Sequence, residues 1–374
     1  MATVQQTDVA VERVDVAAFR VPTATAEESD GTLTWDSTTL VAVEVHGGDE
    51  TGLGYTYCHP AAAQVIESKL AQVVEGADAL MPQAAWAQMQ VQTRQMGHAG
   101  IAAMAVSAVD VALWDLKGRL LGVCLADALP RYRESVPAYG SGGFTSYDDA
   151  RLHDQLAGWA ADGFRSVKIK VGRDPAADPH RVELAREAIG EGVELMVDAN
   201  GAHAPKDGLM WAQRFAEHGV TYFEEPVSSD DLAGLAFVRE RGPAGLAVAA
   251  GEYGWDLAYF RAMLDAGAVD ILQADVSRCG GITNLLRIDG LCKAHNLAFS
   301  SHCVPAISAH AGCGLETLVH AEYFFDHQRL ERMLFDGVLE PVGGLLTPDR
   351  ARPGLGLALR RSDARHHQIY GAPV

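Results

Sequence analysis

The chain has 374 residues, of which 48% are hydrophobic and 21% charged, so it is long enough to bury a full core in two domains or in one barrel with an attachment. Its 30 Lys and Arg against 49 Asp and Glu give a net charge of −19, which repels a phosphate backbone and excludes nucleic acid as an expected partner. An anionic substrate on so acidic a protein requires a local cation, such as a metal ion or a lysine cluster.

The six cysteines are far apart and form no C-x-x-C pair, which is typical of small core residues in a reducing compartment. The start of the chain lacks a basic stretch followed by an apolar one, and no run of about 18 apolar residues occurs. We therefore expect a soluble, cytoplasmic protein without a membrane partner.

The first 130 residues indicate a small sheet followed by helices. Residues 11–54 alternate apolar and polar side chains between turns, which predicts an antiparallel sheet. From Ala105 to Leu121 apolar residues recur at steps of three and four, which predicts an amphipathic helix with one buried stripe.

After Pro137 the pattern changes to short apolar strands that alternate with helical stretches. This alternation, repeated about seven times, predicts a parallel sheet, and its regularity favours a closed barrel over an open sheet. No Gly-x-Gly-x-x-Gly or Walker loop follows a strand, which counts against nucleotide binding. The predicted strands are 136–140, 166–171, 194–200, 221–225, 246–252, 269–275, 297–302 and 320–323.

Polar residues end these strands one after another. In a parallel barrel the carboxyl ends of the strands meet at one mouth, where catalytic residues lie. Surface solvation does not readily explain seven successive strands that end in this way. The residues are Lys168, Lys170, Asp198, Asn200, Glu224, Glu225, Glu252, Asp275, His302 and Glu322.

Asp198, Glu224 and Glu252 end three consecutive strands, so a barrel brings three like charges together. Such a group needs a counter-ion, and an all-oxygen ligand set with open positions suits Mg²⁺. The alternative is that each carboxylate caps a helix or pairs with a surface lysine. For the three together we favour the metal site.

The remaining strand-end residues are candidates for acid and base chemistry. Lys168 and Lys170 lie on one face of a strand, and their mutual repulsion is expected to lower the pKa of one of them. Asp275 is placed to orient His302 and so to give a second acid or base. Glu322, if buried and protonated, would donate a hydrogen bond to an oxyanion.

These motifs together resemble the mandelate racemase subgroup of the enolase superfamily. The resemblance rests on seven motifs in order and on a further segment, 107–115, that resembles the signature of the family's capping domain. The seven motifs are Lys168-x-Lys170, Val197-Asp198-Ala199-Asn200, Glu224-Glu225-Pro226, Gly251-Glu252, Asp275 before Gly280-Gly281-Ile282-Thr283, Ser301-His302 and Glu322.

The resemblance implies a modified TIM barrel, (β/α)7β, under an α+β capping domain. It implies capping residues 1–130, a catalytic barrel 131–342 and a segment 343–374 that returns to the cap. Mg²⁺ on Asp198, Glu224 and Glu252 would hold a substrate carboxylate. Lys170 and His302 would act on opposite faces of the α-carbon, with Lys168 and Glu322 stabilising the enediolate. The family also implies a homo-oligomer.

Several reactions share this first step, the removal of a proton alpha to a carboxylate. The segment Leu272–Arg278 carries no lysine, which disfavours muconate cycloisomerases and dipeptide epimerases. The His and Asp pair favours racemases and acid-sugar dehydratases, and the resemblance implies dehydration of a sugar acid to a 2-keto-3-deoxy acid because that is the commoner activity in this subgroup. Racemisation or epimerisation, cycloisomerisation of a lactone, and a catalytically silent binding or scaffold barrel stay open.

Substrate contacts are expected from the capping loops 21–35 and 55–59, and from the barrel. The first loop is rich in hydroxyl and carboxyl groups, which suits a polyhydroxylated substrate, although a solvated loop explains it equally well. The candidates are Tyr55, Asn200 and Ser141. An aromatic cluster in a domain interface is the more frequent reason for a residue such as Tyr55, and the other two also suit helix capping.

Overall fold

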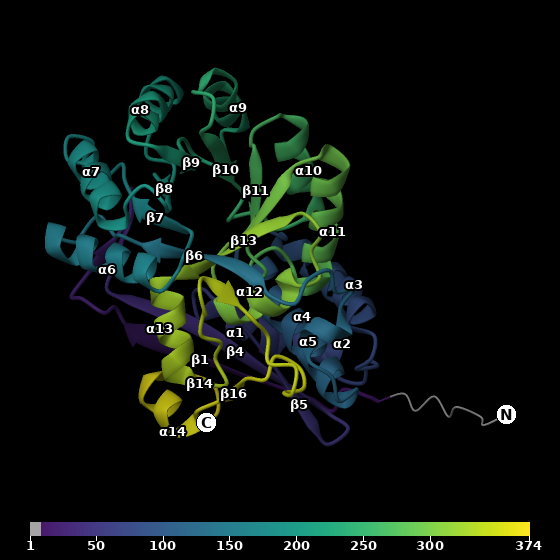
Figure 1. Cartoon of the computed structure of the whole chain (residues 1–374). Coiled ribbons are helices and arrows are strands. Elements are labelled where there is room, and N and C mark those ends of the chain that lie inside the picture. Colours follow the sequence, from purple (N-terminus) through teal and green to yellow (C-terminus); the bar gives the residue numbers. More distant parts are fainter. Residues whose placement is uncertain (1–8) are drawn as a thin grey trace.

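Eight parallel strands close into a barrel, each hydrogen-bonded to the next, with β13 returning to β6 (Figure 1). The computed structural model describes residues 9–374. The barrel confirms the predicted fold class, and each strand begins and ends within three residues of its expected limits. The strands are β6 (Val136–Gly142), β7 (Ser166–Lys170), β8 (Glu194–Asp198), β9 (Val220–Glu224), β10 (Ala247–Ala250), β11 (Ile271–Ala274), β12 (Ala298–Ser301) and β13 (Leu318–Phe324).

A helix follows each barrel strand and lies on the outside of the barrel (Figure 1). Aspartates at the start of three of these helices accept a hydrogen bond from the first turn and so fix where the helix begins. The helices are α6 (Asp149–Ala161), α7 (Asp178–Ile189), α8 (Pro205–Glu217), α9 (Leu232–Arg241), α10 (Leu257–Asp265), α11 (Gly281–His295), α12 (Pro305–Gly312) and α13 (Phe325–Leu334).

Capping elements before the barrel form an antiparallel sheet that packs on one long helix, as predicted. The sheet order is β17-β1-β4-β5, so a strand from the end of the chain joins it. Gly52 and Gly54 let β5 lie directly against α4, because a Cβ at either position would come within 2.2 Å of a helix carbonyl. The elements are β1 (Arg13–Pro22), β4 (Ser37–Gly47), β5 (Glu50–Tyr57), α1 (Ala61–Val65), η1 (Ile66–Leu70), α2 (Ala71–Val74), α3 (Pro82–Thr93), η2 (Arg94–Met96), α4 (Ile101–Leu120) and α5 (Leu125–Ala128).

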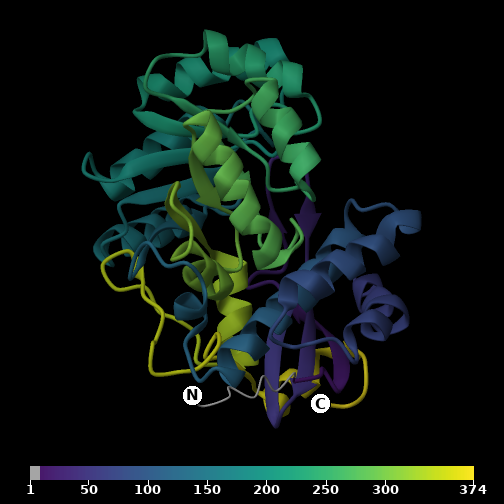
Figure 2. The same ribbon diagram turned by 90° about the vertical axis from the view of Figure 1, so that its right-hand side faces the viewer.

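The segment 107–115 of α4 joins the cap to the barrel. Asp110 accepts a hydrogen bond from the backbone of Thr283 at the start of α11, and Trp114 donates to the hydroxyl of the same residue. Asp115 accepts from the backbone of β5 and, at 2.5 Å, from Leu355 in the C-terminal segment. Buried carboxylates paired in this way hold three parts of the chain in one arrangement. Figure 2 shows α4 running between the cap and the barrel.

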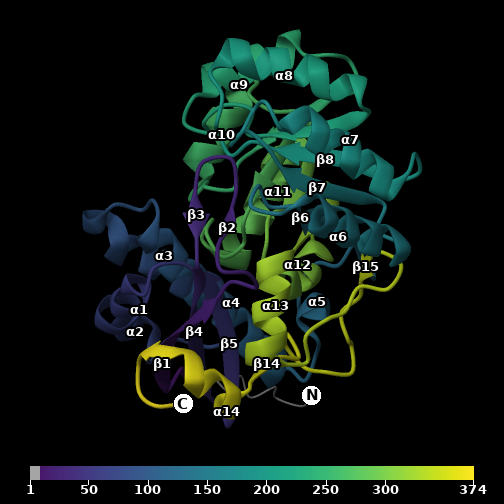
Figure 3. The same ribbon diagram turned by 90° about the vertical axis from the view of Figure 1, so that its left-hand side faces the viewer.

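A hairpin of β2 (Glu28–Ser29) and β3 (Thr34–Trp35) reaches from the capping sheet to the barrel mouth (Figure 3). Its tip makes a close contact, since a Cβ on Gly31 would lie 2.3 Å from the carbonyl of Ala199 and 2.7 Å from that of Val171. These two carbonyls follow β8 and β7, so the hairpin lies over the carboxyl ends of the strands.

The C-terminal segment runs back from the barrel to the cap. It pairs first with β6 and finally with β1, through β15 (Leu345–Leu346) and β17 (Gln368–Tyr370). The limits proposed for the three parts, at residues 130 and 342, stay predictions. Within residues 9–374, no helix is both long enough and apolar enough to cross a bilayer. The remaining elements are β14 (Phe335–Asp336), β16 (Ala358–Leu359), α14 (Arg361–Ala364) and η3 (Arg365–His367).

Candidate active site

The strand-end residues converge at the mouth of the barrel, beneath the hairpin. The parallel register places Lys170, Asp198 and Glu224 side by side on β7, β8 and β9. Below them, the barrel interior is filled by Tyr139, Tyr222, Met196 and Ala249. All the predicted catalytic and metal-binding side chains are at least 94% buried.

Asp198, Glu224 and Glu252 lie close enough to hold one ion, because a ligand oxygen from each falls within 4.8 Å of the others. Burial, and next the charge of Asp198, raise the pKa of Glu224 to about 8. Glu224 Oε1 is buried without a hydrogen-bond partner among the described residues, and Glu252 Oε2 lies 3.0 Å from His302 Nε2. Three buried hard oxygen donors with unused lone pairs fit Mg²⁺.

Both lysines contact this carboxylate group. Lys168 Nζ lies 2.6 Å from Glu224 and 2.9 Å from Glu322, and Lys170 Nζ lies 2.5 Å from Asp198. Burial alone would lower the pKa of each lysine, but the neighbouring carboxylates outweigh it and raise both above the ordinary value. The predicted lowering by mutual repulsion is not found, because carboxylates surround each ammonium group.

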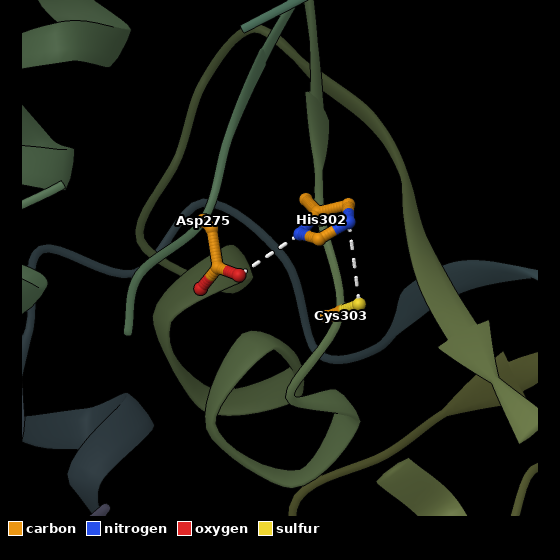
Figure 4. Close-up of side chains that lie close together, drawn as sticks. All are labelled: Asp275, His302 and Cys303. Atoms are coloured by element: carbon orange, nitrogen blue, oxygen red, sulfur yellow. Dashed lines mark hydrogen bonds and ion pairs between the residues drawn. The ribbon is translucent and has the colours of Figure 1, made fainter. Parts of the chain in front are cut away.

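The predicted Asp275 and His302 pair is formed (Figure 4). Asp275 Oδ2 lies 2.9 Å from His302 Nδ1, and the backbone and hydroxyl of Ser277 hold its other oxygen at 2.7 Å. Burial would raise the pKa of Asp275, but hydrogen bonding to His302 and the charge of Arg278 lower it below the ordinary value. An ionised Asp275 therefore holds Nδ1 and leaves Nε2 to face the mouth.

Glu322 was expected to donate a hydrogen bond only if its carboxyl is protonated, and its surroundings favour the ionised form. Burial would raise its pKa, but the charges of Lys168, His302 and Lys170 lower it below the ordinary value. Its oxygens accept hydrogen bonds from Ser141 at 2.6 Å and from the backbone of Cys303 at 2.9 Å. Glu322 is thus placed to orient the cationic groups and has no proton to donate.

The three predicted substrate contacts occupy different surroundings. Ser141 lies in the site but donates its hydroxyl to Glu322. Asn200 follows β8, bonds through its backbone to Asp198, and keeps a buried Oδ1 without a partner among the described residues. Tyr55 is fully buried between cap and barrel, where its hydroxyl donates to Glu331 at 2.5 Å. Only Asn200 retains a free polar atom at the mouth.

Sequence reasoning missed two groups at the mouth. Cys303 places its Sγ 3.3 Å from His302 Nε2, and Arg278 places Nε 3.4 Å from Asp275. Arg278 lies three positions after Asp275, and Cys303 directly follows His302. Proximity in the sequence to these two candidate residues was therefore the available signal. An arginine or a cysteine alone does not indicate a role at the barrel mouth. Only the turns after β11 and β12 direct these two side chains toward it.

Comparisons with known proteins give the site a context. Residues 8–129 match the family model for the mandelate racemase/muconate lactonizing enzyme N-terminal domain, and residues 151–364 match that for the enolase C-terminal domain-like family. A 3,6-anhydro-alpha-L-galactonate cycloisomerase from Streptomyces coelicolor is 33% identical over 93% of this chain and 97% of its own length. An arabinonate dehydratase from Saccharolobus solfataricus is 30% identical over 86% of this chain and 88% of its own.

Solved structures show the same architecture. A mandelate racemase/muconate lactonizing enzyme-like protein from Rubrobacter xylanophilus superimposes with a TM-score of 0.95 at 60% identity, covering 96% of this chain and all of its own. A racemase from Streptomyces coelicolor, crystallised with bound magnesium, gives a TM-score of 0.90 at 31% identity, with coverage of 96% and 100%. The magnesium in that structure agrees with the donor set of the carboxylate site.

Proposed function

The chain belongs to the mandelate racemase/muconate lactonizing enzyme family of the enolase superfamily, and from that premise we propose that it dehydrates a sugar acid to a 2-keto-3-deoxy acid. The observation that carries the proposal is the presence of two acid/base groups, Lys170 and the Asp275-oriented His302, on non-adjacent strands around one carboxylate cluster. β-Elimination needs one group to remove the α-proton and another to protonate the leaving oxygen.

Each residue then has a defined task. Asp198, Glu224 and Glu252 would hold Mg²⁺, which supplies the positive charge that binds the substrate carboxylate and offsets the carboxylates around the lysines. Neutral Lys170 accepts the α-proton at Nζ. Lys168, held between Glu224 and Glu322, keeps its ammonium charge near the developing enediolate.

His302 completes the elimination. Its Nδ1 proton is bonded to Asp275, and Nε2 delivers a proton to the oxygen that leaves the β-carbon. The elements of water leave when that oxygen is a hydroxyl. Ser141 and the backbone of Cys303 hold Glu322, which keeps the cations in place.

A second candidate is cycloisomerisation, in which the leaving oxygen belongs to a ring of the same molecule. It is favoured because two relatives carry this name: the 33% identical Streptomyces protein and a D-galactarolactone cycloisomerase from Agrobacterium fabrum that is 32% identical over 87% of this chain and 90% of its own length. The same Lys170 and His302 serve this reaction, so the substrate's ring decides between the two.

The test is incubation with Mg²⁺ in D₂O with open-chain aldonic and aldaric acids, their lactones and 3,6-anhydro acids. A keto acid lighter than its substrate by one water supports dehydration. A keto acid of unchanged mass, apart from deuterium, supports the cycloisomerase. α-Deuteration without a keto acid shows an epimerase or racemase and overturns both, and no reaction in any substrate favours the silent barrel. Chelation of the metal is the control, since it should abolish every signal.

A further inference from the structure

We propose that His302, Cys303, Glu252 and Glu322 form a second metal site, specific for a thiophilic divalent cation such as Zn²⁺, beside the carboxylate site for Mg²⁺. The proposal rests on ligand geometry and not on the proposed reaction. Occupation of this site blocks His302 Nε2.

Three donor atoms, from His302, Cys303 and Glu322, lie within 3.5 Å of one another, and an oxygen of Glu252 lies beside the first of them. His302 Nε2 lies 3.0 Å from Glu252 Oε2, 3.3 Å from Cys303 Sγ and 3.5 Å from Glu322 Oε2, and Sγ lies 3.4 Å from the same Glu322 oxygen. A tetrahedral Zn²⁺ with nitrogen, sulfur and oxygen ligands holds its donors roughly 3.4–3.6 Å apart. Small side-chain shifts therefore accommodate the ion.

The surroundings are those of a metal site. Asp275 holds Nδ1 of His302 and leaves Nε2 as the free ring nitrogen, which is how carboxylates orient zinc-binding histidines (Figure 4). Glu252 is 97% buried, and its Oε2 lies 3.0 Å from His302 Nε2. A cation bound by both atoms would replace this direct contact.

The backbone at Cys303 and Val304 has an unusual conformation that determines where the thiol lies. Cys303 and Val304 both adopt left-handed conformations, with φ of +49° and +40°. Such conformations are unfavourable for residues with a Cβ and persist only where their surroundings require them. The turn places Sγ on the side of His302 that faces the mouth.

Binding exchanges protons for the cation. The thiol of Cys303 loses its proton as the metal–sulfur bond forms, and His302 releases the proton of Nε2 as the metal–nitrogen bond forms. Both protons pass to solvent, and no group is oxidised or reduced. Affinity therefore rises with pH. Because Glu252 belongs to both metal sites, binding of Zn²⁺ and of Mg²⁺ is coupled.

Cobalt provides a test that does not require the reaction. Co²⁺ is titrated into the full-length protein saturated with Mg²⁺, and a sulfur-to-cobalt charge-transfer band with intense visible absorption is expected at one equivalent. Competing Zn²⁺ should remove the band. Cys303→Ala should abolish it and weaken Zn²⁺ binding by at least ~10-fold in calorimetry.

The matched control is Cys292→Ala, which removes a buried thiol from α11. It should keep the band and the Zn²⁺ affinity of the unchanged protein. Absence of a charge-transfer band in the unchanged protein overturns the proposal, as does a band that survives Cys303→Ala. Cobalt bound to the carboxylate site alone gives weak absorption without the sulfur band, so that result also counts against the site.

Discussion

The strand ends of the barrel and the β2–β3 hairpin both reach the mouth, yet they use polar residues in opposite ways. At the strand ends, a buried oxygen of Glu224 has no hydrogen-bond partner within the described chain. At the tip of the hairpin, the carboxylate of Asp30 accepts from the backbone of Thr32 and Leu33, so this carboxylate is used within the loop. The first region is built to bind something, and the second to hold a shape.

The difference follows from the backbone. Parallel strands fix where successive side chains point, and their carboxyl ends bring like charges together whatever their local sequence. A hairpin tip has no such frame, and its short polar side chains bond to nearby backbone groups instead. Chemistry therefore belongs to the barrel, while the hairpin determines how closely the mouth is covered.

Replacing the proposed base on the barrel strand β7 should have the largest effect on turnover. Lys170→Met removes the proposed base while keeping an unbranched side chain of similar length, and we expect kcat to fall by about 10²–10⁴-fold. Deuterium incorporation at the α-carbon, measured by NMR, should fall equally because both depend on the same proton transfer. Circular dichroism and thermal unfolding should show an intact fold.

The control is Lys206→Met at the start of α8, where the side chain is exposed. It should leave turnover unchanged. If Lys170→Met kept the exchange rate of the unchanged protein, the strand ends would not hold the base, and the contrast between the two regions would fail.

A change in the hairpin should have a smaller effect. In Gly31→Ala the new methyl group would lie 2.3 Å from the carbonyl of Ala199, so the tip must move away from the barrel. A displacement of groups that position the substrate lowers kcat/KM by up to ~10²-fold. We expect this decrease to come mainly from a higher KM, because the acid and base groups stay on their strands and kcat should change little.

Gly158→Ala in α6 is the matched control, since no atom lies within 4 Å of the new methyl group. Its kinetics should equal those of the unchanged protein. A loss in Gly31→Ala confined to kcat would mean that the hairpin contributes to the chemistry itself, which contradicts the division drawn above.

The same contrast explains what the sequence predicted. The barrel strands and the meeting of Asp198, Glu224 and Glu252 followed from polar residues at the ends of apolar runs, because strand order alone brings them together. The ionised state of Glu322 did not follow, since it depends on cations from β7 and β12. The location of Tyr55 at the interface with Glu331 depends on packing between parts 276 residues apart.

The smallest expected effect concerns how the hairpin is anchored. Glu28 is buried against Asp326 at the start of α13, and burial, with hydrogen bonding to Asp326, raises its pKa from 4.5 to about 8. The folded protein thus holds a proton that the unfolded chain releases, so this carboxyl makes stability fall as pH rises from about 4.5 to about 8. Glu28→Gln has no proton to lose, and its Tm should therefore fall less with pH over this window, by a few degrees.

The control is Glu27→Gln, whose side chain is exposed one residue earlier. Its Tm should change with pH as steeply as that of the unchanged protein. Equal slopes for all three proteins would show that the proton shared by Glu28 and Asp326 does not contribute to holding the hairpin, which would then depend on its other contacts, such as those of Ser29 with Thr145 and of Trp35 with Asp326.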